Sequence, residues 1–403
     1  MSKTKLFIVT TYFTPTVSVA SGRMLAFAKY LNKSYFDVIV ITLGNSKKKE
    51  CVQGVGMVEY IENNLLIKAA NFDKKTNYFL HKLKVLWNVF LRNVGHNHLG
   101  DWQKKACNFL GNELLQNPDS IVITSFSPDS PHVIAILLKE KKIPFYWVAD
   151  FRDEMSNNPF LASNQLRNRY IKIESKIKRY ADVTSTVSKP LSENCEKLFT
   201  KTCLEIRNGF DFNQNIERIK NPLFTINFVG TFYGKIKPDV FFKALINVLP
   251  HIDNLKINLF GRCSNILVPK ALKDIVVFQG VVDSATSYAA MQEADVLLLI
   301  LNKNKNYKGV YSTKIFEYLG SGRHVLACID KTDVANTLLV SCNAGYIADC
   351  DDVLDIQNAI LTCYNDWKND TMLDLNYDAI SKLHRHYEVN KLNDFLISKL
   401  KTR

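Results

Sequence analysis

The sequence has no run of apolar residues long enough to cross a lipid bilayer. Its longest aliphatic run is Val296–Leu301, whereas a membrane-spanning helix needs about 20 apolar residues. The apolar run behind Lys3 and Lys5 ends at Thr10, which is too short for the core of a signal peptide. The sequence therefore predicts neither a membrane-spanning nor a secreted protein.

Paired cysteines are also lacking. The chain holds nine cysteines, an odd number, and no two of them stand in a Cys-x-x-Cys spacing. This pattern argues against a disulfide framework and against a zinc cluster. Glycine and proline are scarce as well, at 16 and 11 residues, and no segment has a disordered composition. We expect a globular, cytoplasmic protein with reduced thiols that requires no metal.

The net charge of +13 is divided unevenly along the chain. Residues 1–210 hold 30 Lys and Arg against 18 Asp and Glu, a balance of +12, whereas residues 211–403 hold 22 against 21. A basic half attracts the phosphates of lipids, nucleic acids or sugar nucleotides, and the charge alone does not choose among them. Because no nucleic-acid recognition motif is present, we expect no nucleic-acid partner.

Short apolar runs with β propensity alternate with helical patterns, as is typical of parallel α/β proteins. The runs that predict strands in the first half are Leu6–Thr10, Val38–Thr42, Ser120–Thr124, Phe145–Ala149 and Val183–Val187. Those in the second half are Thr225–Val229, Lys256–Phe260, Val276–Phe278, Val296–Ile300 and His324–Ala327. The segments that predict helices include Gly22–Leu31, Ser130–Lys139, Asp239–Leu249 and Tyr311–Leu319. The fold class predicted is α/β, with two Rossmann-like, doubly wound domains facing a central cleft.

The domain boundary is expected near Asn208–Asn221, where polar residues separate the two sets of strands. We predict an N-terminal domain at 1–210 and a second domain at 211–380. The last segment, Ala379–Lys401, predicts one or two helices, and residues 381–403 are expected to pack back on the N-terminal domain. Ligands of parallel sheets bind beyond the carboxyl ends of the strands, so the cleft is the expected active site.

The most informative segment is Tyr311–Gly322, in which a loop leads into a helix. Ser312 or Thr313 is suited to cap that helix. Its free amides and Lys314 could hold a pyrophosphate. Glu317, one turn further, is placed to accept hydrogen bonds from a ribose diol. The alternative is a capped amphipathic helix with a solvent-facing glutamate.

A second polar cluster, Asp150, Arg152 and Asp153, directly follows a predicted strand. Two carboxylates around an arginine could orient a ligand hydroxyl or stabilise positive charge on a bound ligand, and Asp153 is the preferred residue for this role. The alternative is a structural network of ion pairs.

Further residues follow strand ends in the first half. Ser21, Gly22 and Arg23 begin a predicted helix, where Gly22 permits close backbone approach and amides point to the cleft. Phe126 and His132 follow another strand end and are candidates to line the cleft, although a lone histidine near a helix start is more often structural. Residues 74–105 combine lysines with aromatics, and residues 78–94 predict an amphipathic helix. This helix is either an interfacial surface for anionic lipid or a core-packed helix with solvated lysines.

The segment Tyr311–Gly322 resembles the donor-binding signature of the retaining family 4 glycosyltransferases, which have the GT-B fold. Further motifs resemble that family in the expected order, and together they cover nearly the whole second half: Asn208–Asp211, Phe228–Lys235, Leu259–Arg262, Phe278–Val282, Tyr288 and Ala294–Val296. The family's usual Glu-x7-Glu would place its first glutamate at Gly309. This chain resembles the subfamilies with a Ser/Pro-x-Lys-x-x-Glu pattern, which dispense with it. The departure leaves the donor sugar open.

The resemblance implies a nucleotide-sugar donor, UDP- or GDP-linked, with lysines rather than a metal ion neutralising the diphosphate. The donor-binding residues it implies are Gly230, Thr231, Lys235, Lys237, Arg262, Val281, Ser312, Thr313, Lys314 and Glu317. Retention of anomeric configuration is also implied, and such transfer can use the donor's own phosphate oxygen to accept the acceptor proton.

In the first half, Ser21–Arg23 resembles the family's Gly-x-x-Arg helix start, and Asp150–Asp153 resembles an Asp-(Leu/Phe)-Arg-Asp motif of bacterial polysaccharide glycosyltransferases. This implies Asp153, Asp150 and Arg152 as catalytic residues, and Ser21, Gly22, Arg23, Phe126 and His132 on the acceptor side. The implied acceptor is a lipid-linked saccharide or an oligosaccharide, used in capsule, O-antigen or exopolysaccharide synthesis.

The sequence thus predicts a glycosyltransferase that works in the cytoplasm, with peripheral contact to the anionic inner face of the membrane. Two alternatives stay open. One is a sugar-nucleotide epimerase of the same architecture, which would consume donor without an acceptor. The other is a catalytically silent protein that binds nucleotide or partners, for which the glycine at position 309 is the main support.

Overall fold

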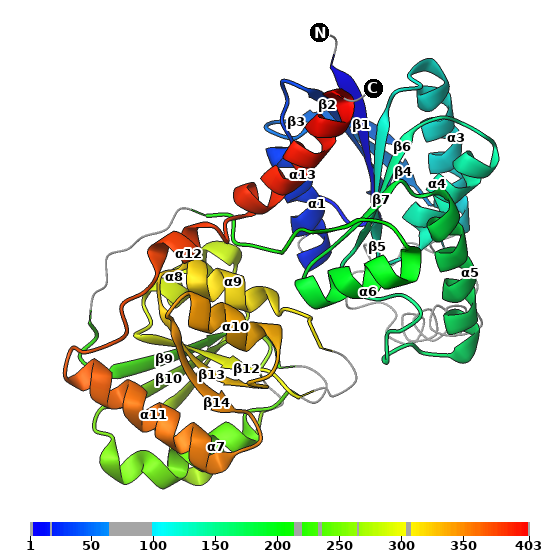
Figure 1. Cartoon of the computed structure of the whole chain (residues 1–403). Coiled ribbons are helices and arrows are strands. Elements are labelled where there is room, and N and C mark those ends of the chain that lie inside the picture. The colour runs from blue at the N-terminus through cyan, green and yellow to red at the C-terminus, as the bar shows by residue number, and fades with distance from the viewer. Residues whose placement is uncertain are drawn as a thin grey trace, which may run out of the picture. The chain divides into compact units, whose positions relative to one another are not determined.

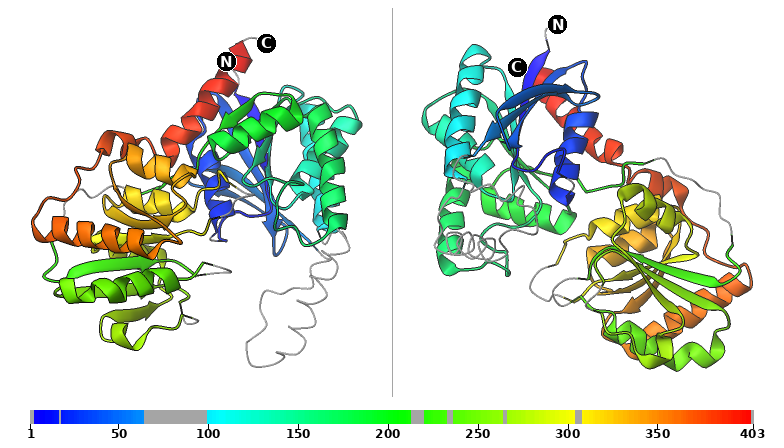
Figure 2. Two further views of the ribbon diagram at one scale, coloured as in Figure 1. Left: turned by 60° about the horizontal axis from the view of Figure 1, so that its bottom comes forward. Right: turned by 180° about the vertical axis from the view of Figure 1, so that it is seen from behind.

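The computed structural model describes residues 3–16, 18–63, 99–212, 220–232, 236–263, 266–303 and 308–401. The chain divides into two compact units. Unit 1 comprises Met1–Arg207 and His386–Arg403, and unit 2 comprises Asn208–Arg385. In each unit, helices cover both faces of one sheet (Figures 1 and 2).

The sheet of unit 1 has eight strands in the order β3-β4-β2-β1-β5-β6-β7-β8. Its strands are β1 (Thr4–Val9), β2 (Phe36–Gly44), β3 (Lys48–Val52), β4 (Gly56–Glu62), β5 (Ile121–Phe126), β6 (Tyr146–Phe151), β7 (Val183–Thr186) and β8 (Cys203–Glu205). Its helices are α1 (Val19–Tyr30), α3 (Gly100–Gln116), α4 (Ser130–Glu140), α5 (Asn164–Tyr180), α6 (Lys189–Phe199) and all but the first residue of α13 (Arg385–Lys401). All pairings are parallel except that between β3 and β4.

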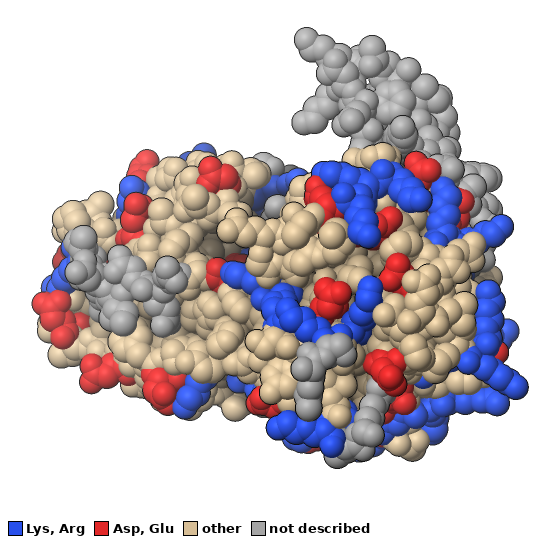
Figure 3. Space-filling model, turned by 90° about the horizontal axis from the view of Figure 1, so that it is seen from above, with Lys and Arg blue, Asp and Glu red and all other residues tan. Residues whose placement is uncertain are grey.

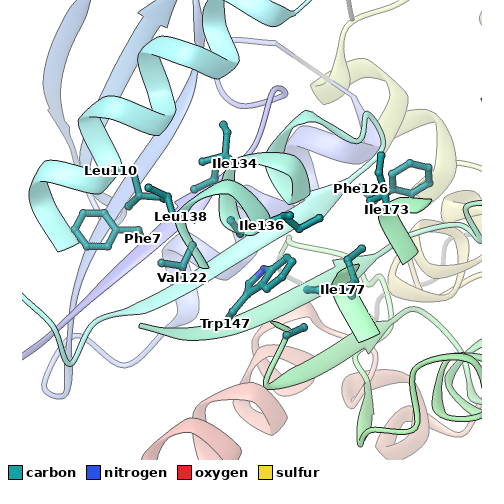
Figure 4. Packing of buried hydrophobic residues seen from close by; sticks show 14 of the residues in the cluster. Phe7, Leu110, Val122, Phe126, Ile134, Ile136, Leu138, Trp147, Ile173 and Ile177 are labelled. Carbon is teal, nitrogen blue, oxygen red and sulfur yellow. The ribbon is translucent and has the colours of Figure 1, made fainter. Parts of the chain in front are cut away.

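The central strands of unit 1 are buried on both faces, as β5 shows, in which every residue is buried. Helices α1 and α13 pack on one face, where Val389, Leu392 and Leu396 of α13 join the core. Helices α3 to α6 pack on the other face. Figure 4 shows that second core, in which Trp147 lies among aliphatic side chains from neighbouring helices.

The sheet of unit 2 has six strands in the order β11-β10-β9-β12-β13-β14, and all pairings are parallel. Its strands are β9 (Phe224–Val229), β10 (Leu255–Phe260), β11 (Val276–Gly280), β12 (Val296–Ile300), β13 (His324–Ile329) and β14 (Gly345–Asp349). Its helices are α7 (Asp239–Val248), α8 (Ser284–Gln292), α9 (Thr313–Gly320), α10 (Val334–Ser341), α11 (Val353–Lys368) and α12 (Tyr377–Ser381), with short 3-10 turns at Leu249–His251 and Lys270–Leu272. Helices α7 and α11 pack on one face, and α8, α9, α10 and α12 on the other.

The strand order of unit 2 reverses direction between β9 and β12, since the chain builds outward first on one side of β9 and then on the other. Such a reversal is the topological switch point at which open parallel sheets bind ligands. The carboxyl ends of β9 and β12 therefore define the place to examine first.

The predicted fold class is confirmed, because the structure has two parallel α/β sheets. Each predicted strand overlaps an observed strand. Helix α1 begins at Val19, earlier than predicted, because Ser18 and Ser21 form a reciprocal capping box. The strands β3, β4, β8 and β14 were not predicted.

Candidate functional site

Glycines follow the carboxyl ends of β9 and the neighbouring β10, next to the switch point. Strand β9 is followed by Gly230, whose φ is +151°, and β10 is followed by Gly261, whose φ is +105°. A Cβ atom on Gly261 would lie 2.0 Å from the carbonyl oxygen of Gly230. Residue 261 therefore requires glycine, because a side chain there would strike the neighbouring backbone. At residue 230 the positive φ favours glycine.

Lys314, from the first turn of α9, lies directly against Gly230. A Cβ atom on Gly230 would lie 2.1 Å from Lys314 Cε. The Lys314 ammonium sits 4.1 Å from the centroid of the Phe228 ring, a favourable cation–π arrangement. Burial lowers the pKa of Lys314 to about 8. No hydrogen bond joins this ammonium to any residue in the described part of the chain.

The amino end of α9 is open to an anion. Ser312 is the N-cap residue, in extended conformation, but its hydroxyl accepts no hydrogen bond from the helix. The first amides of a helix lack partners within the helix and carry a partial positive charge. Thr313 and Lys314 thus present backbone N–H groups next to the Lys314 ammonium, an arrangement suited to phosphate.

Glu317 lies on α9 one turn after Thr313 and is half-buried. Burial raises the pKa of its carboxyl, while Arg385 and Lys314 act in the opposite direction. Within the described ranges, this carboxylate has neither a hydrogen bond nor an ion pair. A desolvated acceptor without a partner is a group that a ligand with hydroxyl donors would satisfy.

Arg385 contributes positive charge near Glu317 and was not predicted from the sequence. Arg385 is the first residue of α13, and its Nε donates to the carbonyl oxygen of Gly209 at 2.8 Å. Its backbone N–H donates to the carbonyl of Phe210 at 2.9 Å. No local motif marks it, because its proximity to Glu317 arises only when distant segments of unit 2 fold together.

The other predicted donor residues stand on loops at the same edge of the sheet. Thr231 is half-buried after Gly230, and Arg262 is exposed after Gly261. Val281 follows β11 and is 71% exposed, unusual for an aliphatic side chain and suited to contact with a planar ring. Lys235 lies outside the described residues.

Lys237 is exposed and lines a separate pocket of about 290 Å³. This pocket lies between the amino end of α7 and the carboxyl ends of β12, β13 and β14, with Asn302 and Lys303 among its lining. Its volume is close to the lower limit for small-molecule pockets, roughly 300 Å³.

A group of possible metal ligands lies at the end of β14. Ligand atoms of Asp349, Cys350 and Asp351 lie within 4.8 Å of one another. Lys303 forms ion pairs there, at 2.6 Å to Asp349 and 3.7 Å to Asp351. A lysine thus already supplies positive charge between these carboxylates.

In unit 1, Asp150 and Arg23 form a buried ion pair. Arg23 donates from Nε and Nη2 to the two carboxylate oxygens at 3.1 and 2.7 Å. Ser185 and Ser125 also donate to Asp150, at 2.8 and 3.3 Å. Arg23 is 1% exposed and Asp150 is 0% exposed, so neither side chain reaches solvent. This geometry favours the structural alternative for the pair.

Arg152 and Asp153 lie closer to the surface. Arg152 donates to the backbone carbonyls of Phe126 and Ser127 at 3.0 and 2.6 Å, and so fixes the loop after β5. Asp153 is half-buried and lines a pocket of about 20 Å³ with Glu154, among others. That pocket holds about one water molecule, so a sugar bound near Asp153 would have to lie outside it.

The remaining acceptor-side candidates are buried, except Gly22, which is half-buried. His132 is 0% exposed, its Nδ1 lies 2.6 Å from the Thr124 hydroxyl, and burial lowers its pKa to about 3. Phe126 packs in the same core. Ser21 is used in the capping box of α1, and the Gly22 amide donates to the Ser18 carbonyl at 2.9 Å. The Gly22 amide is therefore not free for a ligand.

The predicted amphipathic helix at residues 78–94 lies outside the described residues. Among the helices that are described, none is both long enough and apolar enough to cross a membrane.

No protein-family model matches the chain, and no curated protein matches it. Solved structures do match over essentially their whole length. A glycosyltransferase from Rickettsia africae is similar with a TM-score of 0.65 and 13% identity, covering 100% of both chains. A sucrose-phosphate synthase from Thermosynechococcus elongatus is similar with a TM-score of 0.64 and 13% identity, again covering 100% of both.

A third similar structure is described as trehalose-6-phosphate from E. coli bound with UDP-2-fluoro glucose. Its TM-score is 0.58 and its identity 11%, covering 99% of each chain. At these identities the likeness is one of fold. The chain therefore has the two-domain GT-B fold.

Proposed function

We propose that this chain is a glycosyltransferase that transfers a sugar from a nucleoside-diphosphate sugar to an acceptor hydroxyl. Fold alone does not carry this proposal, because one fold hosts many functions. The observation that carries it is the arrangement on α9, where Lys314 and Glu317 lack hydrogen-bond partners among the described residues and Lys314 lies against Gly230.

In this proposal α9 binds the donor's diphosphate and ribose. The first amides of α9 and the Lys314 ammonium neutralise the charge that grows on the diphosphate as the bond to the sugar breaks, the main electrostatic demand of this reaction. Glu317 accepts hydrogen bonds from the ribose hydroxyls. Lysines fill the role that Mg²⁺ has in other transferases, so we expect transfer without added metal.

We propose a uridine or similar nucleotide for the donor. The E. coli structure named above holds UDP-2-fluoro glucose, which supports a uridine or similar donor. The exposed Val281 would contact the base, and Arg262 would approach the diphosphate from the neighbouring strand end. The glycine at position 309 leaves the sugar ring without the family's usual carboxylate contact, which leaves several hexoses open.

On the acceptor side we assign binding to unit 1. Asp153 is the carboxylate assigned to orient the acceptor hydroxyl, while Arg152 holds the adjoining loop through two backbone carbonyls. A donor phosphate oxygen would accept the acceptor proton, with retention of configuration. Asp150 is assigned to support this loop through its ion pair with Arg23.

The acceptor we propose is a lipid-linked saccharide of cell-surface polysaccharide synthesis. The excess of +12 in residues 1–210 supports peripheral contact with an anionic membrane surface. Figure 3 shows one face of the molecule, on which Lys and Arg form several patches with acidic side chains among them. Such mixed charge favours reversible contact rather than tight anchoring.

The donor site is tested by measuring how far nucleotide affinity depends on the ribose hydroxyls, with and without the Glu317 carboxylate. Affinities of UDP and of its 2′,3′-dideoxy analogue are measured by calorimetry for the wild type and for Glu317→Gln, with GDP and its analogue in parallel. Loss of the carboxylate should lower the affinity for the nucleotide that retains its ribose hydroxyls by roughly tenfold. The affinity for the dideoxy analogue should stay nearly unchanged. Glu293→Gln, an exposed position on unit 2, is the matched control.

Turnover then separates the open alternatives. A transferase releases nucleoside diphosphate only when an acceptor is present, an epimerase changes the sugar nucleotide without one, and a silent protein binds without turnover. If neither UDP nor GDP binds and Glu317→Gln changes nothing, the ribose assignment fails.

A further inference from the structure

Strands β9 and β12 separate before they end. Their pairing joins Val296 to Ile226 and Leu297 to Asn227 and goes no further, although β9 continues to Val229 and β12 to Ile300. On its other edge, β9 stays paired with β10 as far as Val229. The backbone of Val229 that faces β12 therefore has no partner in the sheet.

The hydroxyl of Tyr318 occupies this gap. Its oxygen accepts from the Val229 N–H at 2.9 Å, and its O–H donates to the Val229 carbonyl oxygen at 3.2 Å. Tyr318 is 0% exposed, so water does not replace these bonds. One side-chain hydroxyl thus satisfies both backbone groups that a neighbouring strand would otherwise satisfy.

Tyr318 also belongs to the helix that carries the proposed donor groups. It is one residue after Glu317 and one turn after Lys314, which places it on the side of α9 that faces the sheet. Val229 is the residue before Gly230, against which Lys314 lies. The two hydrogen bonds therefore tie the two halves of the candidate site, the β9 end and the amino end of α9, to each other.

We infer that Tyr318 is a positioning residue, whose hydroxyl holds β9 and α9 at the separation that diphosphate binding requires. This inference rests on the proposed function. Tyr318 touches neither the nucleotide nor the sugar in this role; it acts through Val229 and Gly230. Without the hydroxyl, the Val229 N–H and carbonyl would lose their hydrogen bonds, and the Gly230 backbone would shift relative to Lys314.

The experiment compares Tyr318→Phe with Tyr364→Phe in the full-length protein. Both variants keep the ring and lose one hydroxyl that bonds to backbone, because the Tyr364 hydroxyl accepts from the Asp253 N–H at 3.1 Å. Tyr364 lies on α11, on the opposite face of the sheet. The readouts are affinity for UDP and GDP, thermal stability, and amide hydrogen exchange of residues 226–232 and 313–320 without ligand.

Tyr318→Phe should weaken nucleoside diphosphate binding by roughly tenfold or more and speed exchange in both segments. Where transfer is measurable, the KM for donor should rise more than kcat falls. Tyr364→Phe should lower thermal stability alone. The inference is overturned if Tyr318→Phe loses only stability and both nucleotide affinity and exchange match the wild type.

Failure of the proposed function would look different. If the wild type binds neither nucleotide, the donor site is misassigned, while faster exchange in Tyr318→Phe would still show that the hydroxyl holds β9 to α9. Unchanged exchange in that case would overturn the positioning role as well.

Discussion

Lys314 occupies the space that a side chain at position 230 would need. A Cβ atom on Gly230 would lie 2.1 Å from Lys314 Cε and 2.5 Å from Nζ. No side chain at residue 230 can coexist with the present position of this lysine. The position of Lys314 therefore depends on the glycine at residue 230, and a side chain introduced there would displace the lysine.

Gly230→Ala should weaken nucleoside diphosphate binding by at least about tenfold, because the new methyl group displaces the Lys314 ammonium. The control is Gly54→Ala. Gly54 also has a positive φ, of +74°, but nothing lies within 4 Å of a Cβ there. Each variant should lose about 1 kcal/mol of stability or more from backbone strain. Calorimetric titration and thermal unfolding of both variants check this, and equal affinities in the two would contradict it.

Donor affinity should fall as pH rises through the pKa of Lys314, which is about 8. Above that value the free protein holds a neutral amine, so phosphate must bind together with a proton. The dissociation constant should then rise about tenfold per pH unit. In Lys314→Arg the guanidinium stays charged, and the slope should vanish. The measurement runs from pH 7.5 to 9.5 (about the range where the terminal phosphate is fully ionised); the same slope in both proteins would refute the assignment to Lys314.

The same depressed pKa predicts that Lys314 costs stability. Between the folded pKa of about 8 and the unfolded value near 10.4, the unfolded chain binds more protons, so wild-type stability rises with pH in that window. Lys314→Met should be more stable at pH 7 by about 1 to 2 kcal/mol, discounted for partial exposure and the lost contact with Phe228. This gain should shrink as pH rises from 8 to 10. Urea unfolding at pH 7 and pH 10 tests it, and a constant difference would be the contrary result.

The sequence was informative where the relevant groups lie on one short segment. Ser312, Thr313, Lys314 and Glu317 fall within two turns of α9, so helical spacing alone places them on one element. Strands β12 and β13 were recognisable because strands buried on both faces are nearly continuously apolar. The strand β3 was missed because its KKECV sequence is largely exposed and polar, and gives no periodic signal.

Long-range partners could not be predicted from the sequence. Arg23 and Asp150 are separated by 127 residues, and Tyr318 and Val229 by 89. Spacing in sequence says nothing about which such residues meet, because that depends on strand order and on where pairing between strands ends. For the same reason the sequence did not predict that Arg23 and Asp150, both candidate site residues, form an ion pair with each other.

Among the described residues, we expect those of α5 to carry the proposed membrane contact. This helix carries six basic residues and a single acidic one, Glu174, which is buried. Lys172, Lys178 and Arg179 are exposed, and each basic side chain near an anionic surface contributes about 1 kcal/mol. Reversing all three to glutamate should reduce binding to vesicles containing phosphatidylglycerol by more than about tenfold. Reversal of the exposed Lys243, Lys256 and Lys273 of unit 2 is the control, and equal loss in both triple variants would remove α5 from the proposal.

Asp150 and Asp153 should respond oppositely to the same substitution. Asp150→Asn leaves the Arg23 charge buried without a counter-charge, which costs about 3 to 5 kcal/mol of stability. Asp153→Asn, at a half-buried position, should cost about 1 kcal/mol or less and abolish transfer with nucleotide affinity unchanged. Urea unfolding, nucleotide titration and a transfer assay distinguish the two. The double variant Arg23→Met/Asp150→Leu should recover much of the stability lost in Asp150→Asn, because apolar groups of similar volume need no partner. If Asp150→Asn instead unfolds like the wild type and loses only transfer, then Asp150, not Asp153, is the carboxylate that acts on the acceptor.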